Sequence, residues 1–217
     1  ALLTRDSLVW LTEDERDDLA PRFLADGSGI VFLTSRWSPA GDDDTDLARL
    51  DFATRRITQL THGVEADGAP AVSPDGTRIA FVRRYGGTPT SDLCVLTWRD
   101  RAPLCRALPS QSEAEVLDWL SSTVVLLRRG STGDAIGVTV DLRDWAIGLA
   151  PSSTITAVAT EPRSGFLACL CEDTVDRRLG LQIGPIGDPR ARRTARIPGD
   201  RDPRRISIVR AGGPSTT

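Results

Sequence analysis

The sequence predicts an all-β fold, a β-propeller built of four-stranded antiparallel blades. Two segments, residues 21–32 and 70–81, are near copies whose first residues, Pro21 and Pro70, lie 49 positions apart. Short apolar runs punctuated by Gly, Pro and Asp follow each copy, as expected for strands joined by turns. No segment has the pattern of a long amphipathic helix. Because a repeat of this period with short strands is typical of one propeller blade, each copy is expected to belong to a blade.

Each repeat is expected to hold four strands, named inner, second, third and outer. The inner strand precedes the Asp-Gly turn, and the other three follow it at 29–36, 46–51 and 56–63 in the first repeat and at 78–83, 92–97 and 104–108 in the second. Two weaker copies have expected strands at 116–120, 124–127, 136–142 and 145–149, and at 155–160, 166–171, 179–183 and 194–197.

The two ends of the chain predict further strands. Residues 8–12 resemble the outer strand at 57–61, and residues 205–209 resemble an inner strand. We therefore expect about four complete blades plus two orphan strands. They would form a single propeller domain, or a fragment of a larger disc, over residues 1–211, followed by a flexible tail at 212–217.

The turn of the repeat has a clear chemical basis. In Ser73-Pro74-Asp75-Gly76, proline presets φ, aspartate accepts a backbone N–H, and Gly76 takes a positive φ. The alternating side chains that follow, Ile79 and Phe81, are expected to face a neighbouring blade, because a single blade cannot bury both of its faces.

These motifs resemble the TolB-type, WD-like propeller repeat. The resemblance is carried by residues 73–81, by Asp92-Leu93 and by residues 59–63, and it extends over residues 18–110. Beyond residue 110 the Asp-Gly turn is lost. The family includes periplasmic envelope proteins, actinobacterial surface proteins and the non-catalytic propellers of prolyl-oligopeptidase-like enzymes. The resemblance implies an extracytoplasmic, partner-binding disc, commonly with six blades.

Composition limits the classes of partner. The formal net charge of −3 does not favour nucleic acid, and no apolar run is long enough to cross a bilayer. Any attachment to a membrane would therefore use a segment outside this sequence. All 27 basic residues are arginine, which indicates a GC-rich bacterial genome.

Motifs for catalysis, cofactors and metals are missing or incomplete. The sequence has one histidine, His62, and no Gly-x-Ser-x-Gly elbow or phosphate-binding glycine loop. The acidic run at 42–46 alternates carboxylates as a calcium loop does, but Leu47 and Ala53 stand where such a loop needs glycine and glutamate. A solvated loop is the alternative. We expect no enzyme activity and no cofactor.

The four cysteines form two pairs in the sequence. A two-residue loop after Trp98 would place Cys94 directly opposite Cys105 on adjacent strands, at a distance that permits either a disulfide or two buried thiols. Cys169 and Cys171 lie two apart on one expected strand, which is too far to bridge easily, and are expected to be small core residues.

The loops after the second and outer strands should emerge on one face of the disc, which holds the longest loops. A large aromatic residue on such a loop is a candidate anchor for a partner, although Trp37 would lose that role by folding back onto its blade. The predicted partner-binding residues are Arg36, Trp37, Asp42, Asp44, Asp46, Arg84 and Tyr85. The function expected is a non-enzymatic, protein-binding scaffold of the bacterial cell envelope. The alternatives are a gating propeller of a prolyl-oligopeptidase-like hydrolase and a carbohydrate- or calcium-binding module.

Overall fold

The computed structural model describes residues 2–3, 7–13, 15–39, 44–86, 88, 90–100, 102–109, 113–130, 136–149, 155–161, 165–172, 179–186 and 193–196. These residues form strands, turns and loops, and they include no helix that could cross a membrane. The chain divides into two compact units, Ala1–Val116 and Leu117–Thr217. The described residues contain the four predicted antiparallel blades, which confirms the all-β prediction.

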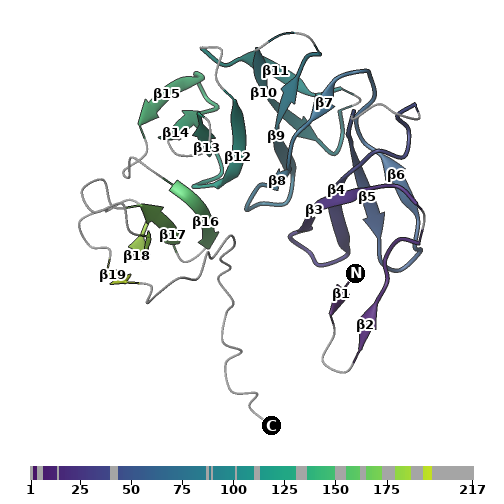
Figure 1. Cartoon of the computed structure of the whole chain (residues 1–217), viewed down its shortest axis with the longest axis horizontal. Helices are drawn as coiled ribbons and strands as arrows, with labels where there is room; N and C mark the ends of the chain where they lie inside the picture. Colours follow the sequence, from purple (N-terminus) through teal and green to yellow (C-terminus); the bar gives the residue numbers. More distant parts are fainter. Residues whose placement is uncertain are drawn as a thin grey trace. The chain divides into compact units, whose positions relative to one another are not determined.

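Blade 1 follows the order of the sequence. It consists of β3 (Asp18–Phe23), β4 (Gly29–Thr34), β5 (Asp46–Asp51) and β6 (Ile57–Gln59), each antiparallel to the next (Figure 1). The register pairs Phe23 with Ile30, Ile30 with Leu50, and Leu50 with Ile57. These apolar side chains therefore share one face of the sheet, since directly paired residues point the same way.

Blade 2 has an interrupted inner strand. The strands β7 (Ala66–Asp67) and β8 (Ala71–Val72) both pair with β9 (Arg78–Arg84), which continues to β10 (Ser91–Thr97) and β11 (Leu104–Ala107). Pro70 lies in the break and has no N–H to give to the ladder. Pro21 holds the matching place in blade 1, where the register of β3 and β4 shifts between Leu19 and Arg22.

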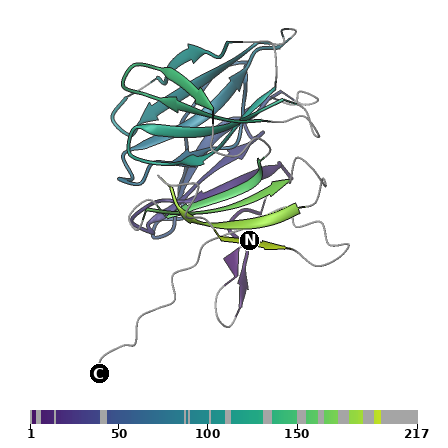
Figure 2. The ribbon, with the colours of Figure 1, turned by 90° about the vertical axis from the view of Figure 1, so that its left-hand side faces the viewer.

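Blades 3 and 4 have the same meander, and the boundary between the compact units falls within the first strand of blade 3. Blade 3 contains β12 (Ala114–Trp119), β13 (Val124–Arg129), β14 (Ile136–Asp141) and β15 (Ala146–Leu149). Blade 4 contains β16 (Ile155–Glu161), β17 (Phe166–Glu172), β18 (Leu179–Pro185) and β19 (Arg193–Arg196). The strands of each blade form one twisted antiparallel sheet, as Figures 1 and 2 show.

The predicted orphan outer strand is shorter than expected and has a partner. Within residues 8–12, only Leu8–Val9 forms a strand, β2, and it pairs with β1 (Leu2–Leu3) in a separate two-stranded sheet. A few residues later Leu11 packs against the apolar face of blade 1. The other predicted orphan strand, residues 205–209, and the predicted tail lie outside the described residues.

The turns of the repeat have the predicted geometry. Gly27 and Gly76 have φ values of 71° and 70°. One oxygen of Asp75 accepts hydrogen bonds from the backbone N–H of Thr77 at 3.0 Å and from its hydroxyl at 2.8 Å. Asp26 accepts the same pair of bonds from Ser28. Burial acts to raise the pKa of Asp75, but hydrogen bonds from Ser73 and Thr77 and the charge of Arg78 outweigh it and hold the pKa at about 2.

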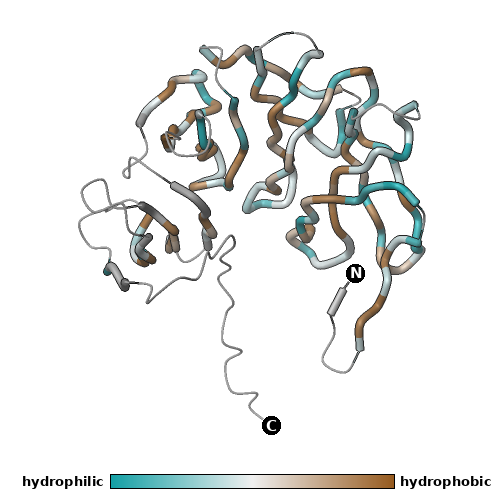
Figure 3. Tube along the Cα trace, in the orientation of Figure 1, coloured by the Kyte–Doolittle hydropathy of each residue, from teal (hydrophilic) through white to brown (hydrophobic). Residues whose placement is uncertain are grey.

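The main described core of the first unit joins blades 1 and 2. Ile79 and Phe81 of blade 2 are completely buried and pack in one cluster with Val31 and Leu47 of blade 1, as the alternation in the sequence predicts. Figure 3 shows hydrophobic residues concentrated on β9 and β10. In the second unit, Cys169 packs in a smaller cluster with residues of blades 3 and 4.

The structure describes the side chains of Cys94, Cys105 and Cys169, whereas the side chain of Cys171 lies outside the described part. Cys94 and Cys105 face each other across β10 and β11 in the predicted register and are joined by a disulfide. Of the two alternatives that the sequence left open, the structure therefore contains the bridge. Cys169 lies in the core as expected, at 1% exposure, but it is also disulfide-bonded, which corrects the expectation that it would not be bridged.

Candidate partner-binding site

The connection between β4 and β5 carries Arg36 and Trp37. The Trp37 side chain is 40% exposed, so part of the indole is open to solvent. The Arg36 guanidinium donates from Nη2 to Asp18 Oδ2 at 2.8 Å, and both side chains are less than one-fifth exposed. Arg36 therefore ties the beginning of this connection to β3, and Trp37 follows directly after the tie.

The three acidic residues predicted to bind a partner, Asp42, Asp44 and Asp46, differ in their surroundings. Asp42 lies outside the described residues. The backbone carbonyl of Asp44 accepts a hydrogen bond from the hydroxyl of Ser38, which links the two described sides of the connection. Asp46 is only 6% exposed, and its carboxylate accepts bonds from Gln59 at 2.9 Å and from Thr61 at 3.4 Å. Burial raises the pKa of Asp46, and the bond from Gln59 opposes this effect. Its surroundings give Asp46 a structural role inside blade 1.

Arg84 and Tyr85 lie where β9 ends. Arg84 is exposed, whereas the Tyr85 hydroxyl donates to Asp92 Oδ2 at 2.8 Å. Burial raises the pKa of Tyr85, and the hydrogen bond to Asp92 acts in the same direction. The phenol is thus fixed against the beginning of β10, and Arg84 presents its charge next to it.

A buried ion pair, which the sequence interpretation missed, connects the bases of these two loops. Asp67 is completely buried and accepts two bonds from Arg83, at 2.8 Å to Nε and 3.1 Å to Nη2. The backbone of Asp67 also exchanges two bonds with Thr45, at 2.8 Å and 2.7 Å. Because Thr45 lies at the end of the first loop and Arg83 just before the second, this network joins the bases of the two loops.

The repeat period contains a signal that could have located this network. Asp18 and Asp67 are separated by the same 49 residues as Pro21 and Pro70. Each aspartate lies in the inner strand of its blade and pairs with an arginine at or just after the end of the second strand, Arg36 or Arg83. The two blades therefore use equivalent carboxylates to hold the loop that follows the second strand.

The chemistry of this region suits recognition. Among the residues that the structure describes, no three His, Cys, Asp or Glu side chains are grouped to hold a metal ion. His62, the single histidine, is exposed on the connection between β6 and β7. The region offers an aromatic surface at Trp37 and a cation at Arg84, both of which are common in protein-binding surfaces.

Comparison with solved structures shows the fold. No protein-family profile matches the chain. TolB from Acinetobacter baumannii superposes with a TM-score of 0.64 at 14% identity, over 82% of this chain and 43% of TolB. A chain of the nidogen/laminin complex gives 0.62 at 8% identity, over 88% of this chain and 68% of that one. A puromycin-hydrolysing peptidase of Mycobacterium tuberculosis gives 0.58 at 17% identity, over 80% of this chain and 28% of the peptidase.

The matches cover only part of the length of these solved structures. This chain spans less than half of the TolB chain and less than one-third of the peptidase chain. Identities this low show that the proteins share an architecture. The chain therefore has the β-propeller fold that is found in TolB.

Proposed function

We propose that this chain is a non-enzymatic propeller scaffold that binds a protein partner through the loops around Trp37. The observation that carries the proposal is a partly exposed indole at 40% exposure directly after a residue that is tied to the blade by an ion pair. A preorganised aromatic side chain loses little conformational entropy on binding, and tryptophan is enriched among residues that dominate binding energy.

We infer that Arg84 and Tyr85 supply a polar rim to this surface. Arg84 is exposed at the end of β9, and the Tyr85 ring lies beside it with its hydroxyl already bonded to Asp92. A central aromatic group surrounded by polar residues is the usual anatomy of a protein interface. With a net charge of −3 the chain offers little general attraction for nucleic acid.

We further propose an extracytoplasmic location in the bacterial cell envelope. The fold is shared with TolB, and disulfides such as Cys94–Cys105 persist mainly in oxidising compartments. Fractionation of cells that produce the full gene product tests this location, and recovery in the cytoplasm with reduced cysteines would overturn it.

A matched pair of tryptophan variants tests the binding surface. The immobilised chain would be used to capture partners from an envelope extract, with Trp37→Ala compared with Trp10→Ala. Trp10 is 62% exposed and lies outside the proposed surface, so its variant controls for general loss of hydrophobic contact. We expect at least one partner protein that the Trp10→Ala variant captures and the Trp37→Ala variant does not. Equal capture by the two variants would exclude this surface.

A gating propeller of a hydrolase is the second candidate. It is favoured by the match of 80% of this chain to only 28% of a puromycin-hydrolysing peptidase. The sequence of the complete gene distinguishes the two candidates, since an adjoining α/β-hydrolase segment supports the gating role and an adjoining membrane helix supports the scaffold.

A further inference from the structure

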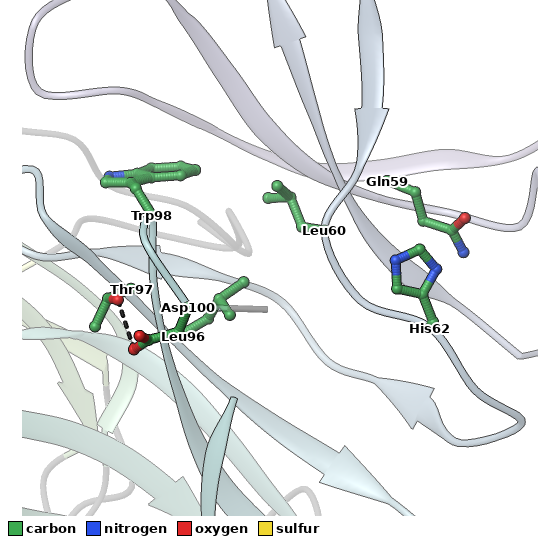
Figure 4. Close-up of a pocket in the computed structure, with 7 residues that line it drawn as sticks. All are labelled: Gln59, Leu60, His62, Leu96, Thr97, Trp98 and Asp100. Carbon is green, nitrogen blue, oxygen red and sulfur yellow. Dashed lines mark hydrogen bonds between the residues drawn. The ribbon is translucent and has the colours of Figure 1, made fainter. Parts of the chain in front are cut away.

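A groove of about 400 Å³ runs between blades 1 and 2, apart from the surface around Trp37. Its walls come from the end of β6 with the residues after it, and from the end of β10 with the turn after it. Figure 4 shows Leu60 reaching across the groove from one wall, with Trp98 and the bonded pair Thr97 and Asp100 on the other. The lining residues are Gln59, Leu60, His62, Leu96, Thr97, Trp98 and Asp100.

The base of the groove is apolar and rigid. Leu60, Leu96 and Trp98 all belong to or pack against the core cluster that joins the two blades. The indole N–H of Trp98 donates to the carbonyl of Gly76, and the Arg49 guanidinium lies 5.4 Å from the ring centre. The Trp98 ring is therefore fixed before any ligand arrives.

A disulfide supports the wall that carries Trp98. Cys94 and Cys105 join β10 to β11 one residue pair away from Val95 and Leu104, the last pair before the turn that contains Trp98 and Asp100. Trp98 also donates its backbone N–H to Thr77 at 3.4 Å, and Asp100 donates its own to Thr97 at 3.2 Å. The turn is thus held both covalently and by backbone bonds.

The polar groups of the groove are mainly acceptors. Asp100 is exposed, and its Oδ2 accepts the Thr97 hydroxyl at 2.6 Å, while Oδ1 accepts no bond from the described residues. The amide nitrogen of Gln59 donates to Asp46, so its Oε1 remains as an acceptor. A ligand that fits this set carries several donors and a positive charge on an apolar stem.

We propose that this groove binds an arginine side chain from an extended segment of a protein partner. The aliphatic stem would lie on Leu60 and Trp98, because long basic side chains bury their methylene groups against apolar surface. The guanidinium would donate to Asp100 Oδ1, a charge-assisted bond stronger than a neutral one. The Arg49 guanidinium already lies over the Trp98 ring, which shows that this ring accepts a cation.

Two peptides that differ in one charge test the proposal. Acetyl-Leu-Arg-Leu-amide is titrated into the isotope-labelled chain and compared with the same peptide carrying citrulline, a neutral analogue of arginine with nearly the same shape. The readout is the NMR signal of the Trp98 indole N–H, assigned with Trp98→Phe. We expect a saturable shift with the arginine peptide and binding about tenfold weaker with citrulline.

Protein variants complete the test. Asp100→Asn keeps an oxygen for the Thr97 hydroxyl but removes the charge, so we expect at least fivefold weaker binding with an unchanged spectrum of the free protein. Arg99→Ala removes an exposed charge from the same turn but outside the lining, and should not weaken binding. Trp37→Ala should also retain binding, which separates this groove from the proposed partner surface. An unshifted Trp98 signal, equal binding of both peptides, or full binding by Asp100→Asn would overturn the inference.

Discussion

Removing the Cys94–Cys105 disulfide should destabilise the first unit by about 3 kcal/mol. The bridge closes a loop with a sequence separation of 11 residues. In the chain-entropy treatment, closing a loop of this length removes on the order of 9 cal/mol/K from the unfolded chain, which is about 2.8 kcal/mol at 25 °C. The free energy of unfolding should fall by roughly this amount when the bond is absent.

Cys105→Ala is the cleanest change for this measurement. Cys105 is half-buried on the outer strand, whereas Cys94 is completely buried in the core between the blades. Changing Cys105 therefore removes the bond and leaves the Cys94 thiol in place, without the cavity that truncating a core residue creates. The expected loss then reflects the cross-link more than the packing.

Urea unfolding with and without dithiothreitol separates this bond from the other one. Cys169 is also disulfide-bonded, so the reductant destabilises the wild-type chain through two bonds and Cys105→Ala through one. The difference between the two responses isolates the cross-link of blade 2, with an expected midpoint shift on the order of 1–2 M urea. Hydrogen exchange of the β10 and β11 amides should locate the loss in blade 2. Equal midpoints for oxidised wild type and Cys105→Ala would refute the entropic reasoning.

Three further substitutions test the core, the buried ion pair and the buried carboxylate. Phe81→Ala should cost about 3–5 kcal/mol in urea unfolding, because the ring is completely buried between the blades, whereas the half-buried Phe52 should cost less. Asp67→Ala should cost about 3–5 kcal/mol by leaving the Arg83 guanidinium without its carboxylate, and a smaller loss in a variant that also replaces Arg83 checks this cause. Asp46→Asn should change the pH dependence of stability. Because burial raises the pKa of Asp46, the folded state holds the proton more tightly, and this stabilisation is lost as pH rises through the raised value. Wild type should therefore lose stability relative to Asp46→Asn as the pH rises above about 3.8, the ordinary pKa of aspartate, and parallel pH profiles would contradict the assignment.

The strands and their register could be predicted because they depend on local chemistry. Alternating apolar residues bounded by short turns define the hairpins, and the pairing of Cys94 with Cys105 followed from the position of one short turn after Trp98. The core position of Phe81 followed from the same alternation. Both features can be predicted without knowing which residues the neighbouring blade contributes.

The roles of the acidic residues could not be obtained in the same way. Asp46 stands beside an acidic run, which suggests an exposed loop, yet it already belongs to β5 and is paired with the buried Thr34. Its carboxylate is satisfied by Gln59 of β6, the strand next to β5, and by Thr61 just after that strand. Whether a carboxylate at the end of a strand is exposed or buried depends on the side chains that the next strand brings beside it, and the alternation of apolar residues within one strand does not specify them.

The repeat that builds the core also builds the support of the loops. Asp18 and Asp67 occur at the period of the repeat, and each anchors the residues around the end of its second strand through a short ion pair with arginine. A buried pair of this kind contributes little net stability compared with apolar packing, so its recurrence is better explained by the position that it gives to the following loop. Trp37 directly follows one of these arginines, and Tyr85 lies two residues beyond the other. The scaffold proposal thus depends on two features of the first two repeats. Apolar alternation packs the blades together, and one aspartate in the inner strand positions the loop that a partner would contact.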